Sequence, residues 1–473
     1  MVFSSTVFTF LFLPVVLALY YLAKERYRNA ILLAASIFFY AYGEPYFVFI
    51  MLASVLLNYL SALLVDRYRG SRKAAVLLAA DIALNLGILF IFKYLDFSIR
   101  VIDSVFKRDL APIGIALPIG ISFFTFQAMS YVIDVYRGTA PVQKNPLNVA
   151  LYISFFPQLI AGPIVRYNTI AKQIEERTCS VEKFGEGAKR FMTGFGKKVI
   201  LANNLALVAE EAFRQTDFAS GTLAYSWLGA IAFSLQIFYD FSGYSDMAIG
   251  LGKMFGFEFL ENFDYPYISS SVTEFWRRWH MSLGQWFRDY VYIPLGGSRE
   301  GTGKTIRNLF VVWLLTGIWH GANYTFIFWG LSYFVLLILE KYVIRPGIRG
   351  AAVRFVWRVF TLLCVNFLWV LFNAPSMNYA MNYLLSMAGW FRTPAGFTAP
   401  SVLRVLREFG IYYLLGLLFA APVLRKFEQK LETSATGRAV LTYMSPVLYI
   451  LMFLWAVSFL ILGAHNPFIY FNF

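Results

Sequence analysis

The sequence predicts an all-helical, polytopic integral membrane protein. Hydrophobic residues make up 59% of the 473 residues and charged residues only 14%, whereas an ordinary soluble domain has about 25% charged residues. Apolar runs recur along the whole chain, and the basic residues lie in the short stretches between them. Together these observations predict a chain that crosses the membrane many times.

The apolar runs predict the individual membrane segments. Several runs are shorter than the roughly 20 residues that a helix needs to cross a bilayer, and the run that starts at Asn308 is longer, so we expect broken, tilted or re-entrant helices. We expect about 11 to 13 membrane segments by this length rule. Because no repeat or long linker interrupts the chain, residues 1–473 are predicted to form one integral membrane domain. The runs are 2–23, 30–43, 46–65, 74–92, 116–135, 147–164, 199–213, 223–241, 308–339, 353–372, 411–424 and 442–462.

The net charge of +14 is explained by membrane topology. The basic residues of stretches 24–28 and 66–73 lie in short loops, and such loops tend to stay on the cytoplasmic side. Stretch 166–198 continues into a pattern of helical spacing that is typical of a helix at a membrane surface. We therefore expect lipid contacts and no nucleic-acid partner.

Several site types are not supported by the sequence. Cys179 and Cys364 lie far apart, and three histidines without a ligand spacing give no metal pattern, so we predict neither a disulfide framework nor a metal site. The stretch GGSREGTGKT ends like a phosphate-binding loop, but Ser298 stands where that motif requires glycine. The first apolar run has no basic segment before it and is expected to be a retained helix.

His320 lies in the apolar segment VVWLLTGIWHGANYTFIFWG. An imidazole in a membrane span is costly unless it is paired or faces a cavity, which makes it a functional candidate. Twelve helical steps from Asn308 bring His320 roughly 18 Å into a hydrocarbon layer about 30 Å thick. Gly317 and Gly321 would allow another backbone to approach closely. The alternative is a structural histidine that bonds across two helices. Polar groups about one turn away are Thr316, Asn323 and Tyr324.

His280 lies in the aromatic and basic segment EFWRRWHMSLGQWFRDYVYIPLGG. If this segment is one helix, its spacing places a ring-rich side toward the protein at the inner face of the membrane. The arginines would then contact lipid phosphates or an anionic donor such as coenzyme A. The alternative is that His280 is a hydrogen-bonded packing residue. The shared face would comprise Trp276, Trp279, His280, Leu283 and Phe287, and the arginines are Arg277, Arg278 and Arg288.

A second polar cluster interrupts the apolar segment LQIFYDFSGYSDMAIGLGKMFGF. Lipid-facing sequence does not tolerate this density of polar groups, so we expect them to face the protein interior or water. They would line a buried reaction chamber or, alternatively, form a polar seam between helices. The cluster comprises Gln236, Tyr239, Asp240, Ser242, Tyr244, Ser245 and Asp246.

These segments carry a resemblance to a known family. The chain resembles the membrane-bound O-acyltransferase superfamily, and within it the alginate O-acetylation branch of bacterial polysaccharide acetyltransferases. The matching pieces extend over nearly the whole chain. They are QIFYDFSGYSDMAIG, NFDYPYISSSVTEFWRRWHMSLGQWFRDYVYIPLGG, GIWHGANYTFIFWG, LPIGISFFTFQAMSYVIDVYRG, FFPQLIAGPI and the closing NPFIYFNF.

The resemblance implies a helical fold around a transmembrane tunnel in a bacterial inner membrane. It also implies that His320 corresponds to the family's near-invariant histidine and His280 to its second characteristic histidine. The acyl donor would enter from the cytoplasm as a thioester, here acetyl-CoA, and no bound cofactor is expected. A periplasmic or extracellular partner would then place the acetyl group on a polysaccharide such as alginate.

The chemistry of acyl transfer fits these residues. A hydroxyl nucleophile needs a base within hydrogen-bond reach, and a buried, neutral His320 would accept its proton. Asn323, Tyr239 or a backbone N–H would steady the oxyanion, and His280 would orient the donor or assist proton transfer. The remaining substrate or tunnel candidates are Asp240, Ser242, Trp276, Arg277, Arg278, Trp279, Ser282 and Trp319.

Two other functions stay open from the sequence. A transporter would also need buried polar groups, but it should show inverted repeats or paired broken helices, which the sequence does not display. The second is transfer of D-alanine to teichoic acid, or acylation of a lipid or protein. The glycerolipid acyltransferase signature is absent, because Gln285 and Thr325 stand where it requires Asp after the two histidines.

Overall fold

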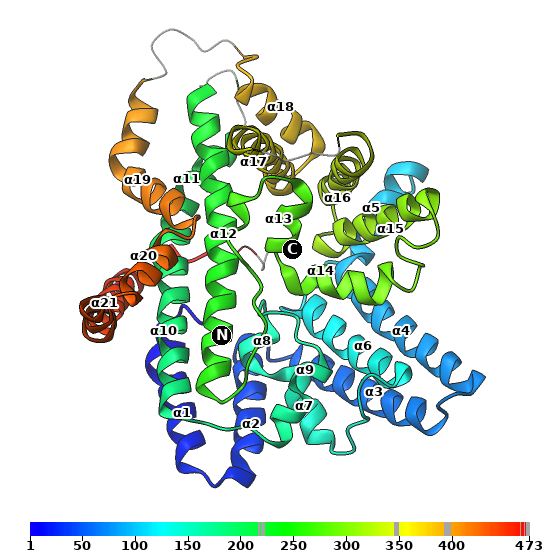
Figure 1. Cartoon of the computed structure of the whole chain (residues 1–473). Coiled ribbons are helices and arrows are strands. Elements are labelled where there is room, and N and C mark those ends of the chain that lie inside the picture. The colour runs from blue at the N-terminus through cyan, green and yellow to red at the C-terminus, as the bar shows by residue number, and fades with distance from the viewer. Residues whose placement is uncertain are drawn as a thin grey trace. The chain divides into compact units, whose positions relative to one another are not determined.

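The fold consists of helices, as the sequence predicts. The computed structural model describes residues 1–215, 218, 223–344, 350–391, 399–463, 465–467 and 469. In these residues every regular element is a helix (Figure 1). Of the closing segment NPFIYFNF, only Asn466, Pro467 and Ile469 are described, and the rest lies outside the described residues. The predicted all-α class is confirmed.

Contacts divide the chain into two compact units, Met1–Phe191 with Tyr244–Leu260 and Met192–Gly243 with Glu261–Phe473. Helices α10 (Val181–Gly196) and α12 (Leu223–Met254) each contribute residues to both units. The single domain predicted over residues 1–473 stays a prediction.

The first unit is built mainly from the N-terminal helices, blue to cyan in Figure 1. Within it, α10 packs closely on α12. A Cβ added to Gly187 would lie 2.6 Å from the carbonyl oxygen of Gly250, so only glycine allows this approach. The predicted helix in stretch 166–198 is therefore present, and its packed side faces α12. The other helices are η1 (Phe8–Phe12), α1 (Leu13–Leu22), α2 (Glu25–Gly43), α3 (Val48–Arg67), α4 (Arg72–Lys93), α5 (Leu95–Phe106), α6 (Ile121–Arg137), α7 (Pro146–Ser154), α8 (Phe156–Leu159) and α9 (Tyr167–Glu175).

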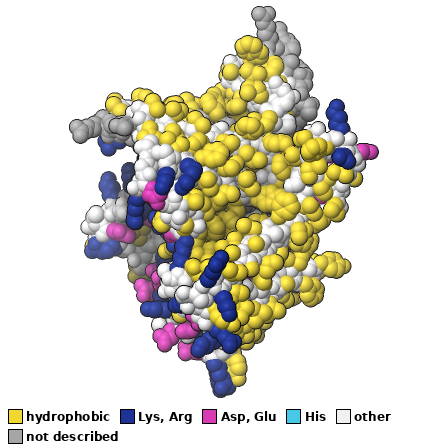
Figure 2. Space-filling model, turned by 90° about the vertical axis from the view of Figure 1, so that its right-hand side faces the viewer, with side chains coloured by type: hydrophobic (Ala, Val, Ile, Leu, Met, Phe, Trp, Pro, Cys, Tyr) yellow, Lys and Arg dark blue, Asp and Glu magenta, His cyan; other side chains and the backbone are white. Residues whose placement is uncertain are grey.

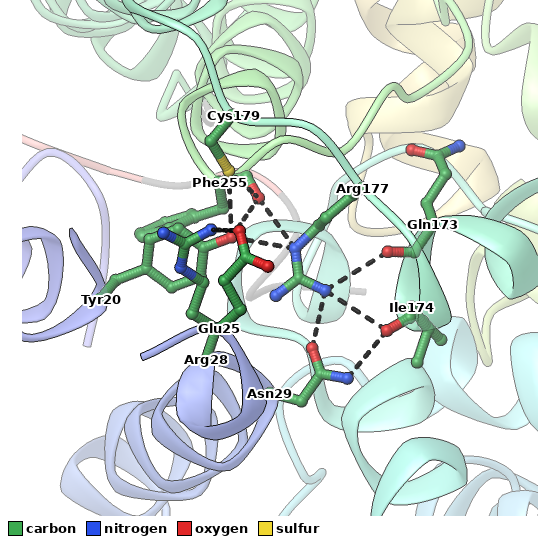
Figure 3. A network of polar contacts seen from close by, with 9 residues as sticks. All are labelled: Tyr20, Glu25, Arg28, Asn29, Gln173, Ile174, Arg177, Cys179 and Phe255. Atoms are coloured by element: carbon green, nitrogen blue, oxygen red, sulfur yellow. Dashed lines mark hydrogen bonds and ion pairs between the residues drawn. The ribbon is translucent and has the colours of Figure 1, made fainter. Parts of the chain in front are cut away.

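Arg177 joins four segments of the first unit (Figure 3). Its Nε donates to the hydroxyl of Tyr20 on α1 at 2.9 Å and to the carbonyl of Phe255 at 3.1 Å. Its Nη1 donates to Oδ1 of Asn29 on α2 at 2.7 Å, and the Asn29 amide donates to the carbonyl of Ile174 on α9 at 2.8 Å. The guanidinium of Arg177 presents its N–H donors in a fixed fork, and here the acceptors are neutral groups. Through these bonds Arg177 holds α1, α2 and α9 to the chain that follows α12.

The second unit contains the helical hairpin of α15 (Thr302–His320) and α16 (Tyr324–Ile338), which lie side by side (Figure 1). The long apolar run that begins at Asn308 is thus broken between the two helices, as predicted. The other elements are η2 (Lys197–Ala202), α11 (Asn203–Phe213), η3 (Pro266–Ile268), α13 (Val272–Arg278), α14 (Met281–Phe287), η4 (Arg288–Tyr292), η5 (Leu339–Ile344), α17 (Ala351–Asn373), α18 (Met377–Met387), α19 (Ala399–Phe419), α20 (Val423–Glu432) and α21 (Ala435–Ile461).

Glycines set the distance between α15 and α16. A Cβ on Gly317 would lie 2.5 Å from the carbonyl oxygen of Phe326, and one on Gly330 would collide with the backbone of Trp313. The predicted close backbone approach at Gly317 is confirmed. At Gly321 a Cβ would instead meet the ring of Phe326.

Five helices in the described residues are long and apolar enough to cross a membrane: α3, α4, the continuous helix Tyr324–Ile344, α17 and α21. Figure 2 shows a face covered largely by hydrophobic side chains, with Lys and Arg side chains at its margin. The protein is therefore a multi-pass membrane protein. The predicted count of about 11 to 13 segments stays a prediction, because the other apolar runs form helices that do not meet this length and composition test.

Candidate active site

The chain around His280 is a broken helix. Helix α13 ends at Arg278, Trp279 is extended (φ −105°, ψ 128°), and His280 adopts the left-handed conformation (φ 44°, ψ 53°) before α14 begins. The predicted single helix, with Trp276, Trp279, His280, Leu283 and Phe287 on one face, is wrong here. A non-glycine residue in this conformation costs on the order of 1–3 kcal/mol, and such residues cluster at functional sites.

Two side chains fix the start of α13. The hydroxyl of Ser271 accepts from the N–H of Glu274 at 3.0 Å, as expected for an N-cap. The carboxylate of Glu340 accepts from the N–H groups of Val272 at 2.7 Å and Thr273 at 3.1 Å. These bonds satisfy orphan donors and place a negative charge at the positive end of the helix, which positions the segment that leads to His280.

Asn262 holds His280 in place. Its Oδ1 accepts from the backbone N–H of Ser282 at 3.1 Å and from the Ser282 hydroxyl at 2.9 Å, and it lies 3.2 Å from Nδ1 of His280. Since a backbone N–H only donates, the amide orientation is fixed and Nδ1 of His280 carries a proton. Nε2 is then the basic nitrogen of this buried ring.

His320 is the last residue of α15 and is 4% exposed. Its Nδ1 lies 2.7 Å from the carbonyl oxygen of Thr316, one turn earlier. Because a carbonyl only accepts, Nδ1 carries a proton, and in the neutral form of the ring Nε2 is the acceptor nitrogen. Gly321 is extended, and Asn323 starts α16 by accepting from the N–H of Thr325 at 3.3 Å. The depth of His320 in the membrane stays a prediction.

The two histidines lie in one aromatic cluster, and Trp319 is a neighbour of both. The Trp319 ring centroid is 6.0 Å from that of His280 and 5.0 Å from that of His320. The Trp329 ring centroid lies 4.8 Å from that of His320. Burial lowers the pKa of His280 well below its ordinary value, and the nearby His320 acts in the same direction. His280, which lies outside the five candidate spans, is therefore held neutral.

The tryptophans predicted near His280 pack in two directions. Trp279 is buried against Trp369, with ring centroids 4.9 Å apart. Trp276 contacts Tyr333 at 4.8 Å and Trp329 at 5.7 Å between centroids. The structure thus brings Trp276, Trp279, His280, Ser282, Trp319 and His320 into one region of the second unit.

The polar cluster of α12 is buried, as the sequence predicts. Its members in the second unit are Gln236, Tyr239, Asp240 and Ser242, and those in the first are Tyr244, Ser245 and Asp246; all are at most 5% exposed. Tyr239 donates to the carbonyl of Gly416 at 2.5 Å, and Asp240 forms an ion pair with Lys198 at 2.6 Å. These two side chains therefore hold helices together.

The oxyanion donors suggested by the sequence already have other partners. The hydroxyl of Tyr239 is engaged by Gly416, and the amide of Asn323 donates to the carbonyl of Pro375 at 3.0 Å. The single O–H of Tyr239 is therefore used by the fold, whereas the Asn323 amide has a second N–H donor. The oxyanion role of these side chains stays a prediction.

The arginines differ in their surroundings. Arg278 binds the carboxylates of Asp264 at 2.8 Å and Glu274 at 3.0 Å, which makes it a structural residue. Arg288 is bonded to its neighbour Asp289 at 2.7 Å. Arg277 is exposed and is the arginine here best placed to meet an anionic donor or a lipid phosphate.

Three residues of this region were not singled out from the sequence: Asn262, Trp329 and Tyr333. Asn262 opens the segment NFDYPY, and Trp329 closes the segment that follows His320. Trp329 and Tyr333 are one helical turn apart on α16, which places them on one face. In the sequence, Trp329 and Tyr333 stand in an apolar stretch and look like ordinary core residues.

Comparison with known proteins decides the family. The profile of the "MBOAT, membrane-bound O-acyltransferase family" matches residues 139–386. The chain is 41% identical to the "probable alginate O-acetylase AlgI" of Pseudomonas putida, covering all of both chains. It is 32% identical to the "peptidoglycan O-acetyltransferase" of Helicobacter pylori, over 82% of this chain and 80% of that one. The chain belongs to the membrane-bound O-acyltransferase family.

A third relative of this O-acyltransferase is the "teichoic acid D-alanyltransferase" of Bacillus subtilis, 30% identical over 53% of this chain and 67% of that one. In the described part of the acyltransferase, no three His, Cys, Asp or Glu side chains gather where they could hold a metal ion.

In this acyltransferase, we expect Asn262→Ala to lower the rate of acyl transfer on the order of 10- to 100-fold, because a small displacement of a site group is costly. Asn262→Asp keeps the three acceptor contacts and should retain most of the rate. Its negative charge should raise the pKa of His280 and shift the pH–rate profile toward higher pH. A wild-type rate in Asn262→Ala at normal protein levels would exclude this positioning role.

Proposed function

We propose that this acyltransferase transfers an acetyl group from a cytoplasmic thioester, acetyl-CoA, to a hydroxyl of an exported polysaccharide such as alginate. Two of the relatives, from Pseudomonas putida and Helicobacter pylori, carry names that specify O-acetylation. The structural observation that carries the proposal is the bond from Nδ1 of His320 to the carbonyl of Thr316, since it leaves Nε2 as a base in a buried site.

In the proposed reaction, Nε2 of His320 takes the proton of the acceptor hydroxyl as the oxygen attacks the thioester carbonyl carbon. The C–O bond forms, and the carbonyl electrons move onto oxygen to give a tetrahedral oxyanion. When the oxyanion collapses, the C–S bond breaks and the sulfur takes the proton from Nε2. The products are an ester and a free thiol, and His320 is returned to its starting state.

We further propose that His280 orients the donor or assists this proton transfer. Its neutral ring is fixed by Asn262, and both it and the His320 ring contact Trp319. The acetyl group would reach the acceptor through a tunnel across the bacterial inner membrane, and a periplasmic or extracellular partner would complete placement on the polymer. Arg277 is the proposed contact for the anionic part of the donor.

Transfer of D-alanine to teichoic acid is the second candidate function. It is supported by the relative from Bacillus subtilis, which is less similar and covers about half of this chain. The acetyl proposal is preferred because the relative from Pseudomonas putida is similar over the full length. The two candidates differ in the acyl group that appears on the exported polymer.

The test measures both acyl groups and the fate of the donor. Cells that lack the endogenous gene and express this chain should carry ester-linked acetate, and no added D-alanine, on their exported polysaccharide. Inverted membrane vesicles supplied with labelled acetyl-CoA should release free thiol in proportion to the label transferred. D-Alanine on the polymer would contradict acetyl transfer, and export without thioester cleavage would identify a transporter.

A further inference from the structure

Two buried hydrogen-bond donors on α16, one turn apart in the helix that follows His320, have no hydrogen-bond partner among the described residues. They are Nε1 of Trp329 and the hydroxyl of Tyr333, and both side chains are 0% exposed. Nε1 of Trp276 is a third such donor. Because the large majority of buried side-chain polar atoms in proteins are hydrogen-bonded, a group of three neighbouring donors that are not needs an explanation.

The three donors belong to one cluster around His320. The Trp329 ring centroid lies 4.8 Å from that of His320, 5.3 Å from that of Tyr333 and 5.7 Å from that of Trp276. Trp276 and Tyr333 are 4.8 Å apart. Trp329 therefore lies beside the proposed base, Tyr333 and Trp276 lie against Trp329, and the donors come from two elements, α13 and α16.

Elsewhere in the same unit the fold satisfies some such groups and leaves others, such as the hydroxyls of Ser242 and Thr361, without a partner among the described residues. The indole N–H of Trp227 donates to the carbonyl of Met387 at 2.9 Å, and the hydroxyl of Tyr383 donates to the carbonyl of Ser226 at 3.0 Å. Leaving a buried donor without a partner is costly. The cluster near His320 is distinguished by the grouping of three such donors and by their contact, through Trp329, with the proposed base.

The chemistry of the donors defines what they can bind. An indole N–H only donates, and a tyrosine hydroxyl next to it can donate as well. Their ligand must therefore present a hydrogen-bond acceptor, such as a carbonyl oxygen, within an aromatic surround. A thioester offers this acceptor, and its oxygen becomes negatively charged during acyl transfer, when donors gain most in strength.

We propose that Trp329 and Tyr333, with Trp276, bind the carbonyl oxygen of the acyl thioester and stabilise the oxyanion that forms when the acceptor attacks. This inference rests on the proposed function and assigns residues to it. In this role they are preferred to Tyr239, whose single O–H donates to the carbonyl of Gly416.

The experiment removes each donor while keeping its ring. One variant is Tyr333→Phe. The other carries benzothienylalanine, a tryptophan analogue without the N–H, at position 329. Each should lower the turnover number for acetyl transfer on the order of 100-fold. Their unfolding temperatures should not fall, because no bond within the protein is lost. The matched controls, Tyr383→Phe and Trp227→Phe, lose a bond to the fold and should be less stable with a near wild-type turnover number.

Binding provides an independent readout. The purified wild-type protein should bind acetyl-CoA more tightly than S-ethyl-CoA, a thioether that lacks the carbonyl oxygen, and Tyr333→Phe should reduce this preference. Equal binding of the two compounds by wild type would overturn the inference whatever the acceptor is. Suppose that the variants at positions 329 and 333 keep the wild-type turnover number while His320→Ala is inactive. This result would overturn the oxyanion role of Trp329 and Tyr333 and leave the proposed function intact.

Discussion

Replacing His320 by alanine is expected to lower acetyl transfer on the order of 10²- to 10⁴-fold, which is the range for loss of a general base. The substitution removes Nε2, the nitrogen that the Thr316 contact leaves as the acceptor of the ring. It leaves Trp329 and Tyr333 in place, so the donor should still bind. The measurement is ester-linked acetate on the exported polymer, together with thiol release from acetyl-CoA in membranes.

The third histidine supplies the control. His465 is 36% exposed at its side chain and pairs with Glu210 at 2.7 Å, away from the aromatic cluster. His465→Ala should therefore keep a near wild-type rate. If His320→Ala matched His465→Ala in rate and in membrane protein level, His320 would not be the base.

Replacing Lys198 by methionine is expected to cost about 3–5 kcal/mol of unfolding free energy, because it leaves a buried carboxylate without its counter-charge. The Lys198 and Asp240 side chains are 3% and 2% exposed, and their charged atoms are 2.6 Å apart. The pair also holds the C-terminal segment, since Asp240 Oδ2 accepts from the N–H of Ile469 at 2.9 Å and Lys198 donates to the carbonyl of Pro467. Thermal and denaturant unfolding of the purified protein would measure the loss.

A double variant separates the charge from the volume. Lys198→Met combined with Asp240→Asn leaves no unpaired buried charge and should recover part of the loss. The matched exposed pair is Lys304 with Glu300, whose side chains are 54% and 48% exposed. Lys304→Met should change stability by only about 0–1 kcal/mol. Equal stabilities of Lys198→Met and Lys304→Met would show that the buried pair does not stabilise the fold.

Composition and periodicity were sufficient for the fold class, since they report directly on burial and membrane contact. The interior position of the α12 cluster, including Tyr239 and Asp240, followed from the cost of polar groups in lipid. The break at His280 did not follow, because it depends on Asn262, which is 18 residues away in sequence. Local spacing records helical tendency and contains no information about such a tertiary contact.

The candidate site, too, could be predicted only in part from the sequence. The two histidines stood out because ionisable groups are rare in apolar sequence. Tyr239 donates to Gly416 and Asn323 donates to Pro375, and both acceptors are distant in sequence. An oxyanion role for the two donors could therefore not be judged from the sequence. Tyr333 lacks any mark of its own in an apolar helix, and only its missing hydrogen bond distinguishes it from a core residue.

The most direct test of the account is the protonation state of the His320 ring nitrogens. With three histidines in the chain, ¹⁵N NMR of histidine-labelled protein can be assigned by single His→Gln variants. At neutral pH the His320 ring is expected to be neutral, with the proton on Nδ1 and none on Nε2. A proton on Nε2, with Nδ1 bare, would contradict the claim that His320 is poised as the base.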